Sequence, residues 1–271
     1  MKIFKNKLNL QKEISKDNCL SFVPTMGGLH KGHLSLIKKA KRYKCKICVS
    51  IFVNPTQFNK KNDFKNYPRN LKLDIKKLKK LKINYLYLPS YRDIFSFKPK
   101  NKIYVDKFSK QLCGKFRNGH FRGVLNVVNR FLEIIDPKYI FLGIKDFQQL
   151  NLIDRHIKKN RIKTKVVECM TIREKNGVAC STRNLNLNKN ELMIAANIYK
   201  YLFNLNKKIK KNYKLFKINT IKKDLFSLGA TKIDYIKNLD IKNFYKKRKL
   251  KNKFRLFIAY YINNVRLIDN I

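Results

Sequence analysis

The stretch Pro24–His33, PTMGGLHKGH, decides the fold because it joins a short apolar run to a helical pattern. The run before it, Leu20–Val23, is typical of a strand that Pro24 ends, and Leu34–Tyr43 has the spacing of a helix with Leu34, Ile37 and Ala40 on its inner face. Such a turn presents unpaired backbone N–H groups and the positive end of the helix dipole. We therefore expect it to bind an anion, and phosphate above all.

A P-loop can be excluded for this turn, and three other interpretations stay open. Gly27 and Gly32 have the spacing of a P-loop, but His33 and Leu34 follow where a P-loop has Lys and then Ser or Thr. The turn is then a glycine-rich surface loop, a pair of histidines that donate hydrogen bonds to phosphate, or an HxxH metal site. The metal interpretation lacks further ligands, because the chain has 4 histidines and no other ligand cluster.

Length and composition indicate a globular protein with a real core. The chain has 271 residues, of which 44% are hydrophobic, enough for one large domain or two small ones. Residues 1–18 contain no apolar run of signal-peptide length, and no stretch reaches the ~18 apolar residues of a membrane span. We expect a soluble, cytoplasmic protein with no membrane partner.

The formal net charge of +47 makes nucleic acid the first partner to consider. The lysines, however, are spread over nearly every predicted element together with abundant Asn and Ile, which favours a drift in residue usage. The densest runs are Lys76–Lys82, Lys207–Lys214 and Lys246–Lys253. We interpret them as solvated faces and expect no specific nucleic acid partner, with an RNA-binding patch as the alternative.

The six cysteines raise the question of a metal or redox site. Cys45 and Cys48 form a C-x-x-C at the entry of a predicted strand, where residues three apart point to opposite faces. No second C-x-x-C accompanies them. We therefore expect reduced structural thiols, no disulfide and no zinc.

Strand and helix patterns alternate through residues 1–175, which predicts an α/β, Rossmann-like domain with a parallel sheet. Besides the opening strand and helix, the predicted strands are 46–53, 83–88, 102–106, 138–143 and 164–172, and the helices are 69–83, 121–135 and 145–159. In helix 69–83, the stripe of Leu71, Ile75, Leu78 and Lys82 is expected to face inward.

The pattern changes after the run REKNGVACSTRN, Arg173–Asn184. Predicted helices at 188–211 and 221–230, the second ended by Gly229, precede predicted strands at 232–240, 253–262 and 264–270. Residues 176–271 therefore read as a smaller α+β C-terminal domain that acts as a lid, with a hinge near Arg173–Gly177.

Polar loops follow several of the predicted parallel strands, and ligands bind at the carboxyl ends of such strands. In Asn54–Phe58, the amides of Asn54 and Gln57 suit a small polyol acid, although Asn54 before Pro also suits a turn. In Gly143–Gln149, Lys145 suits phosphate, and Asp146 suits ribose or water-held magnesium. The run Ser181–Arg183 supplies hydroxyls and a guanidinium for outer phosphates.

These motifs together resemble the pantoate–β-alanine ligase (pantothenate synthetase) family, nearly from end to end. The resemblance rests on VPTMGGLHKGH, SIFVNPTQF, YPRNLKLD, RNGHFRGVLNVVNRFLEIIDP, FLGIKDFQQL, REKNGVACSTRN and VRLIDN. It implies ATP-dependent coupling of D-pantoate to β-alanine with Mg²⁺, through a pantoyl adenylate, by a homodimer. Other nucleotidyltransferases with the same type of histidine motif, and a basic RNA-binding protein on this scaffold, are the alternatives.

The resemblance also implies roles for individual residues. His33, with His30 and Lys145, would be catalytic; Gln57 and Gln149 would bind pantoate, and Gln57 β-alanine. ATP would contact Met26, Gly27, Gly28, Leu29, His30, Lys31, Gly32, His33, Gly143, Ile144, Lys145, Asp146, Ile172, Cys180, Ser181, Thr182 and Arg183. This chain departs from the family pattern at Thr182, where Ser is usual, at Asn118, where Pro is common, and at Asn263 or Asn264, where Gly is usual.

Overall fold

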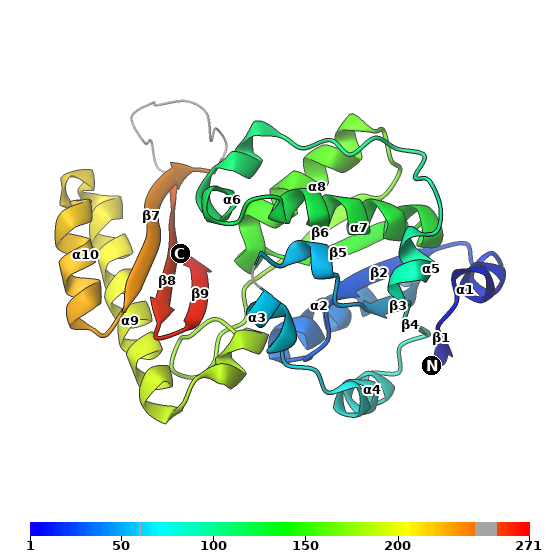
Figure 1. The fold of residues 1–271 in the computed structure, drawn as a ribbon, viewed down its shortest axis with the longest axis horizontal. Coiled ribbons are helices and arrows are strands. Elements are labelled where there is room, and N and C mark those ends of the chain that lie inside the picture. Colours follow the sequence, from blue (N-terminus) through cyan, green and yellow to red (C-terminus); the bar gives the residue numbers. More distant parts are fainter. Residues whose placement is uncertain (60, 242–253) are drawn as a thin grey trace. The chain divides into compact units, whose positions relative to one another are not determined.

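The computed structural model describes residues 1–59, 61–241 and 254–271, and these form two compact units (Figure 1). The first unit is Met1–Ile172 and the second is Arg173–Ile271. We predicted a boundary after residue 175, but Arg173 forms an ion pair with Asp269 at 2.6 Å and so belongs with the second unit. No helix in the described parts of the chain is long and apolar enough to cross a membrane.

The first unit contains one sheet of six strands in the order β1-β4-β3-β2-β5-β6, and every neighbouring pair is parallel. The strands are β1 Lys2–Phe4, β2 Leu20–Thr25, β3 Lys46–Ile51, β4 Tyr85–Tyr87, β5 Tyr139–Gly143 and β6 Lys165–Cys169. The Rossmann-like prediction is confirmed, and β1 is added at the edge beside β4.

Helices cover both faces of this sheet (Figure 1). Their bounds are α1 Lys7–Ile14, α2 Lys31–Lys41, α3 Lys61–Lys65, α4 Leu71–Lys80, α5 Tyr91–Phe95, α6 Leu112–Phe116, α7 His120–Ile135 and α8 Phe147–Lys159. On one face, Ile37 of α2 and Leu78 of α4 share a core with Val49 of β3. On the other, Phe131 of α7 packs against Phe22 with ring centroids 5.4 Å apart. Burial of this apolar surface holds the layers together.

Two predicted features of the sheet are wrong. Residues 102–106 form no strand, because their backbone is held by side chains: the Tyr104 N–H donates to His156 Nδ1 at 3.2 Å, and the nearby Asn101 N–H donates to Glu133 at 3.1 Å. Pro24 does not end β2, which continues to Thr25. The pairing of β2 with β5 stops before Pro24, so its missing N–H costs no bond to that strand.

The expectation of no disulfide is also wrong, because Cys19 and Cys45 are bonded, with Cα atoms 5.0 Å apart. The cause is the register of β2 and β3, which pairs Leu20 with Lys46 and so places the residues before them side by side. Sequence spacing does not reveal that register. The remaining cysteines, Cys48, Cys113, Cys169 and Cys180, are buried thiols outside this disulfide, and burial raises the pKa of Cys169 to about 11.

We predict four titratable thiols in the denatured protein without reductant and six after reduction. A thiol-reactive dye in guanidinium measures both numbers. As a control, Cys19→Ser should show five thiols with or without reductant, since its partner is released. Six thiols in the unreduced wild type would contradict the bond.

The second unit is an antiparallel sheet in the order β7-β8-β9 with two helices packed on it. Its elements are α9 Lys189–Lys211, α10 Ile218–Ser227, β7 Lys232–Asp240, β8 Phe254–Ile262 and β9 Val265–Asn270. Ile198 of α9 and Leu225 of α10 share the core with Ile258 of β8. The predicted small α+β fold is confirmed, and Gly229 follows α10 with φ +103°. The basic run 246–253 lies outside the described residues.

The turn between β8 and β9 accommodates the departure from glycine noted in the sequence. Ile262 pairs with Val265, so Asn263 and Asn264 form a two-residue hairpin turn. Asn263 has φ +49°, and Asn tolerates this left-handed conformation better than most residues. Its side chain also donates to Glu191 Oε1 at 2.6 Å.

Candidate functional site

The site of the first unit is set by the strand order. From β2 the chain proceeds to β3 and β4 on one side of the sheet, and later continues from β5 to β6 on the other. The carboxyl ends of β2 and β5 therefore flank the point where the strand order reverses. In open α/β sheets, ligands bind at that point. The two motifs that leave these strand ends are the turn Met26–His30 and the segment Gly143–Asp146.

The turn after β2 requires glycine. Gly27 has φ +79° and Gly28 has φ +60°, both in the left-handed region. A Cβ on Gly27 would also lie 3.1 Å from Ile51 Cγ2 and 3.2 Å from Asp74 Oδ2. Thr25 fixes the entry to the turn, because its hydroxyl donates to the Ser50 carbonyl at 2.7 Å and accepts the Gly27 N–H at 3.3 Å.

Sequence reasoning missed Asp74, which holds this turn. Its Oδ2 accepts the Gly28 N–H and its Oδ1 accepts the Leu29 N–H, both at 2.8 Å. The predicted inward stripe of α4 began at Leu71, but Leu71 is 46% exposed and Asp74 only 2%. A periodicity analysis assigns a carboxylate to the outer face. The signal was the position of Asp74 one turn before Leu78, on the stripe that packs inward.

The expectation of unpaired N–H groups in this turn is wrong. Several of its backbone donors are each satisfied by a side chain of the protein, as buried N–H groups almost always are. The pairs are Gly27 with Thr25, Gly28 and Leu29 with Asp74, His30 with His33, and Gly32 with His30. A phosphate at this place would therefore be met mainly by side-chain donors.

The two histidines are the side chains placed to act as such donors. His30 is the N-cap of α2, and its Nδ1 accepts the Gly32 N–H at 3.1 Å. His33 lies in the first turn of the helix, and its Nδ1 accepts the His30 N–H in a long bond of 3.4 Å. Because each Nδ1 is an acceptor, these bonds assign the proton of each neutral ring to Nε2. The ring centroids are 4.0 Å apart.

The electrostatics of His33 link the turn to the segment after β5. Desolvation by burial lowers the pKa of His33 well below its usual value, and electrostatic interactions with the His30 ring and with the charges of Lys145 and Lys77 lower it further. The ring is therefore neutral at pH 7. The Lys145 charge thus acts on His33, although the two residues follow different strands, β2 and β5.

The segment after β5 has open space beside its first glycine. Gly143 leads into the 3₁₀ helix Ile144–Asp146, and a Cβ built on Gly143 would meet nothing within 4 Å. The Lys145 Nζ lies 3.6 Å from Asp146 Oδ1, and the two side chains are 19% and 49% exposed. Ile144 is buried. The segment thus offers a cation and a carboxylate beside open space.

The loop after β3 is a 3₁₀ helix, Pro55–Gln57, docked on the start of α7. Asn54 is fully buried; its Oδ1 accepts the Thr56 N–H at 3.3 Å and its Nδ2 donates to the Gly123 carbonyl at 3.2 Å. A Cβ on Gly123 would lie 2.5 Å from the Thr56 carbonyl oxygen. Of the two interpretations of Asn54, turn formation is therefore the one the structure supports.

Gln57 is held by its backbone. Its carbonyl accepts from Arg117 Nη2 at 3.0 Å and lies 2.7 Å from His120 Nδ1, so the ring donates from that nitrogen. The segment around Asn118 is itself tied, because the Asn118 carbonyl accepts from Asn59 Nδ2 at 2.5 Å. Absence of the family's usual proline does not leave this loop untethered.

Two adjacent glutamines at the start of α8 have different roles. Gln148 is buried; its Oε1 accepts the Cys113 N–H at 3.0 Å, and its Nε2 donates to the carbonyls of Phe108 and Gln111 at 2.7 Å. Gln149 is half-buried, and within the described ranges its amide, like that of Gln57, forms no hydrogen bond to the protein. Gln57 and Gln149 therefore retain amides for a ligand.

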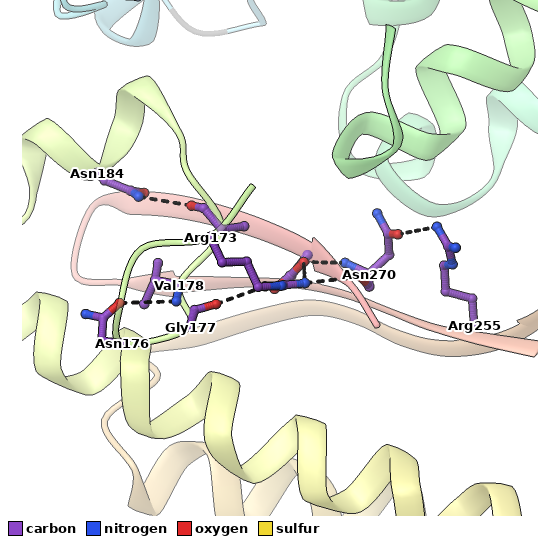
Figure 2. A network of polar contacts seen from close by, with 9 residues as sticks. Arg173, Asn176, Gly177, Val178, Asn184, Arg255 and Asn270 are labelled. Atoms are coloured by element: carbon purple, nitrogen blue, oxygen red, sulfur yellow. Dashed lines mark hydrogen bonds and ion pairs between the residues drawn. The ribbon is translucent and has the colours of Figure 1, made fainter. Parts of the chain in front are cut away.

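In the second unit, Arg173 ties the segment that precedes Ser181–Arg183 to β9 (Figure 2). Its guanidinium pairs with both Asp269 oxygens at 2.6 and 3.0 Å and donates to the Gly177 carbonyl at 3.1 Å. It also lies 4.4 Å from the centre of the Tyr199 ring. Gly177, with φ +89°, is required because a Cβ there would lie 2.1 Å from Tyr199 Cε1.

The members of that run are placed differently from one another. Ser181 and Arg183 are half-buried, and Ser181 Oγ accepts the Arg183 N–H at 3.3 Å. Cys180 and Thr182 are buried, and Cys180 Sγ donates to Glu174 Oε1 at 3.1 Å. The departure at Thr182 thus falls on a buried position. Ile172 is half-buried at the end of the first unit.

Comparison with known proteins agrees with this arrangement. The profile of the family described as pantoate-beta-alanine ligase matches residues 2–271. The pantothenate synthetase of Francisella tularensis subsp. novicida is 40% identical over 268 residues, 97% of this chain and 92% of that protein. That of Flavobacterium psychrophilum is 39% identical over 269 residues, 98% of this chain and 95% of that protein.

Solved structures give the same result. The pantoate-beta-alanine ligase of Francisella tularensis, complexed with beta-gamma ATP and beta-alanine, is 38% identical, has a TM-score of 0.85, and matches 100% of this chain and 97% of its own. Pantothenate synthetase from Thermus thermophilus is 28% identical with a TM-score of 0.92, covering 100% of this chain and 99% of that one. The chain therefore belongs to the pantoate–β-alanine ligase family.

Proposed function

We propose that this protein condenses D-pantoate with β-alanine through an enzyme-bound pantoyl adenylate formed at the end of β2. ATP-dependent condensation of these two substrates is the activity of the family to which the chain belongs. The observation that supports the location is the electrostatic link between His33 and Lys145 at the reversal of the strand order. The test is pyrophosphate release that requires both ATP and pantoate.

In the first step, the pantoate carboxylate attacks the α-phosphorus of ATP and pyrophosphate leaves. Negative charge builds on the phosphate oxygens, so the protein must supply donors and positive charge there. His30 and His33 would donate from Nε2, the nitrogen that their internal hydrogen bonds leave protonated. Lys145 would neutralise charge on the departing pyrophosphate, and its largely buried side chain makes that interaction stronger than in water.

The site also fits the Mg²⁺ that the family resemblance implies. Among the residues that the structure describes, no three His, Cys, Asp or Glu side chains gather into a metal cage. Mg²⁺ in nucleotide sites is usually held by phosphates and water with one or two carboxylates. Asp146, beside Lys145, would hold the ion through water. When bound, Mg²⁺ would offset the charge of the phosphates.

In the second step, the β-alanine amine attacks the adenylate carbonyl and AMP leaves. Water must be kept from this mixed anhydride, and we assign that role to the second unit as a lid. Ser181 and Arg183 would contact the outer phosphates of ATP, because their side chains stay half-buried while Cys180 and Thr182 are buried. The remaining predicted ATP contacts, from Met26 to Gly32 and at Ile172, belong to the same proposal.

The proposed assembly is a cytoplasmic homodimer without a specific nucleic acid partner. Light scattering of the purified protein tests the dimer. If the lysines reflect residue usage across the chain and form no binding patch, the protein will bind RNA weakly. Its affinity for RNA will then fall steeply as the salt concentration rises, because binding rests on counterion release alone.

Gln57→Ala and Gln149→Ala should each raise the KM for pantoate about tenfold. Loss of one hydrogen bond to a polar ligand costs roughly 1.4 kcal/mol, which is tenfold in affinity. Steady-state kinetics with pantoate as the varied substrate measures this. Gln11→Ala on α1 is the matched control, and Gln148→Ala should lower thermal stability because it removes three internal hydrogen bonds. An unchanged KM in both first variants would overturn the assignment of pantoate to these amides.

A further inference from the structure

Helix α4 supplies two charged side chains to the histidine turn, and neither belongs to the motif that forms the turn. Asp74 and Lys77 are three residues apart and so lie on the same face of the helix. Asp74 accepts two consecutive N–H groups of the turn, and Lys77 Nζ donates to the carbonyl of Leu29. One face of α4 thus binds the N–H groups of Gly28 and Leu29 and the carbonyl of Leu29.

The chemistry of this contact needs a carboxylate. An ionised Asp is an acceptor at both oxygens, which matches two N–H donors at 2.8 Å each. An asparagine of the same shape would present an NH₂ group to one of these donors. With Asp74 nearly fully buried, no water replaces the lost bond, so the turn would have to shift. His30 directly follows the residues held in this way.

The position of His33 depends on its charge state. Its Nδ1 can accept the His30 N–H only while that nitrogen is unprotonated. Protonation would replace the hydrogen bond with two facing N–H groups and turn the ring away. The charged or titratable groups that act on His33 are His30 in the turn, Lys77 on α4 and Lys145 after β5, and each disfavours the imidazolium.

We propose that Asp74 and Lys77 are positioning residues for adenylate formation: Asp74 fixes the glycine turn that orients His30 and His33, and Lys77 anchors that turn while adding positive charge beside His33. The inference rests on the proposed function, because it assigns the two histidines to the adenylation step. Neither residue touches substrate in this account; both act through the histidines.

Asp74→Asn is the first test. Misplacement of a catalytic group by about 1 Å can cost about 10²-fold in rate, so we expect a loss of adenylate formation of that order, with a much smaller change in the KM for ATP. Single-turnover kinetics measures the rate, and circular dichroism checks the fold. Asp154→Asn on α8, the same change of charge at another helix, is the control and should keep the wild-type rate. A wild-type rate in Asp74→Asn would overturn the role of Asp74.

Lys77→Met is the second test, and it stays informative if Asp74→Asn does not fold. Without the Lys77 charge the pKa of His33 rises toward its usual value, so the acid limb of the adenylation rate should move to higher pH. Lys76→Met, the exposed neighbour on the same helix, changes the net charge equally and should leave that limb in place. An acid limb unmoved in Lys77→Met would overturn the role of Lys77.

Histidine ring NMR separates this inference from the proposed function. In the wild type we expect the Nε2–H tautomer of His33, and in Lys77→Met a titration shifted to higher pH, whether or not the protein makes pantoyl adenylate. The shifted titration with no adenylate in the wild type would refute the proposed function and leave the role of Lys77 standing. Adenylate formation with an Nδ1–H tautomer would refute the positioning of His33 alone.

Discussion

Replacing His33 with alanine is expected to lower the rate of pantoyl adenylate formation by about 10²-fold or more, the scale for loss of one preorganised donor. The neutral ring carries its proton on Nε2 because Nδ1 accepts the His30 N–H, so removing it deletes a donor aimed by the helix start. Rapid-quench analysis of a single turnover with labelled ATP measures this step apart from product release.

The fold should survive this change. His33→Ala removes one capping contact of α2, worth about 1 kcal/mol, and leaves Leu36, Ile37 and Ala40 in the core. Lys38→Ala, on the exposed face of the same helix, is the control and should react as the wild type does. If His33→Ala forms adenylate at the wild-type rate, the ring does not stabilise the transition state.

Lys145→Ala should lower adenylate formation by a similar factor of about 10². Its side chain is only 19% exposed, so its charge is screened less than that of a surface lysine. Removing it also removes a positive charge that acts on His33, so the acid limb of the remaining activity should move to higher pH. The same single-turnover assay over a pH series measures both effects.

The matched control for Lys145 is Lys158→Ala on α8, where the side chain is 73% exposed and pairs with Asp154 along the helix. An exposed pair of this kind contributes little to stability, and it lies in no candidate site. A loss in Lys158→Ala equal to that in Lys145→Ala would show that overall charge, rather than the position of Lys145, determines the rate.

Much of the fold follows from periodicity and from the rule of right-handed crossovers. The apolar runs of β2, β3 and β5 and the inward stripe of α7 were predicted because their patterns are strong and local: Val124, Val127, Val128, Phe131 and Ile135 are all buried. Parallel pairing then places the loops after β2 and β5 together, so His33 and Lys145 could be assigned to one site from the sequence.

The misses arise from contacts between residues far apart in the chain. Asp74 is a buried acceptor for the N–H of Leu29, 45 residues earlier in the chain. Hydrophobic periodicity does not predict such a contact. Cys19 and Cys45 meet through a strand register that their spacing does not encode. Residues 102–106 look like a strand but bond to the side chain of His156. In each case a hydrogen bond or a disulfide to a distant residue determined the structure, and the local sequence pattern did not predict it.

Distant contacts also explain why the sequence predicted only part of the structure of Pro24–His33. Its glycines and helix start predicted a turn at the end of β2, where the strand order reverses, but the N–H groups expected to bind an anion there are satisfied within the protein. The turn instead orients two imidazole rings. The turn is therefore better described as a support for two imidazole side chains than as a backbone anion-binding loop.

The most direct test of this account is a single turnover of the wild-type enzyme with ATP, Mg²⁺ and D-pantoate in the absence of β-alanine. We predict one equivalent of pyrophosphate per active site and a matching amount of enzyme-bound pantoyl adenylate, which is converted to pantothenate and AMP when β-alanine is added. Release of ADP and phosphate, or no pyrophosphate until β-alanine is present, would contradict the adenylate mechanism.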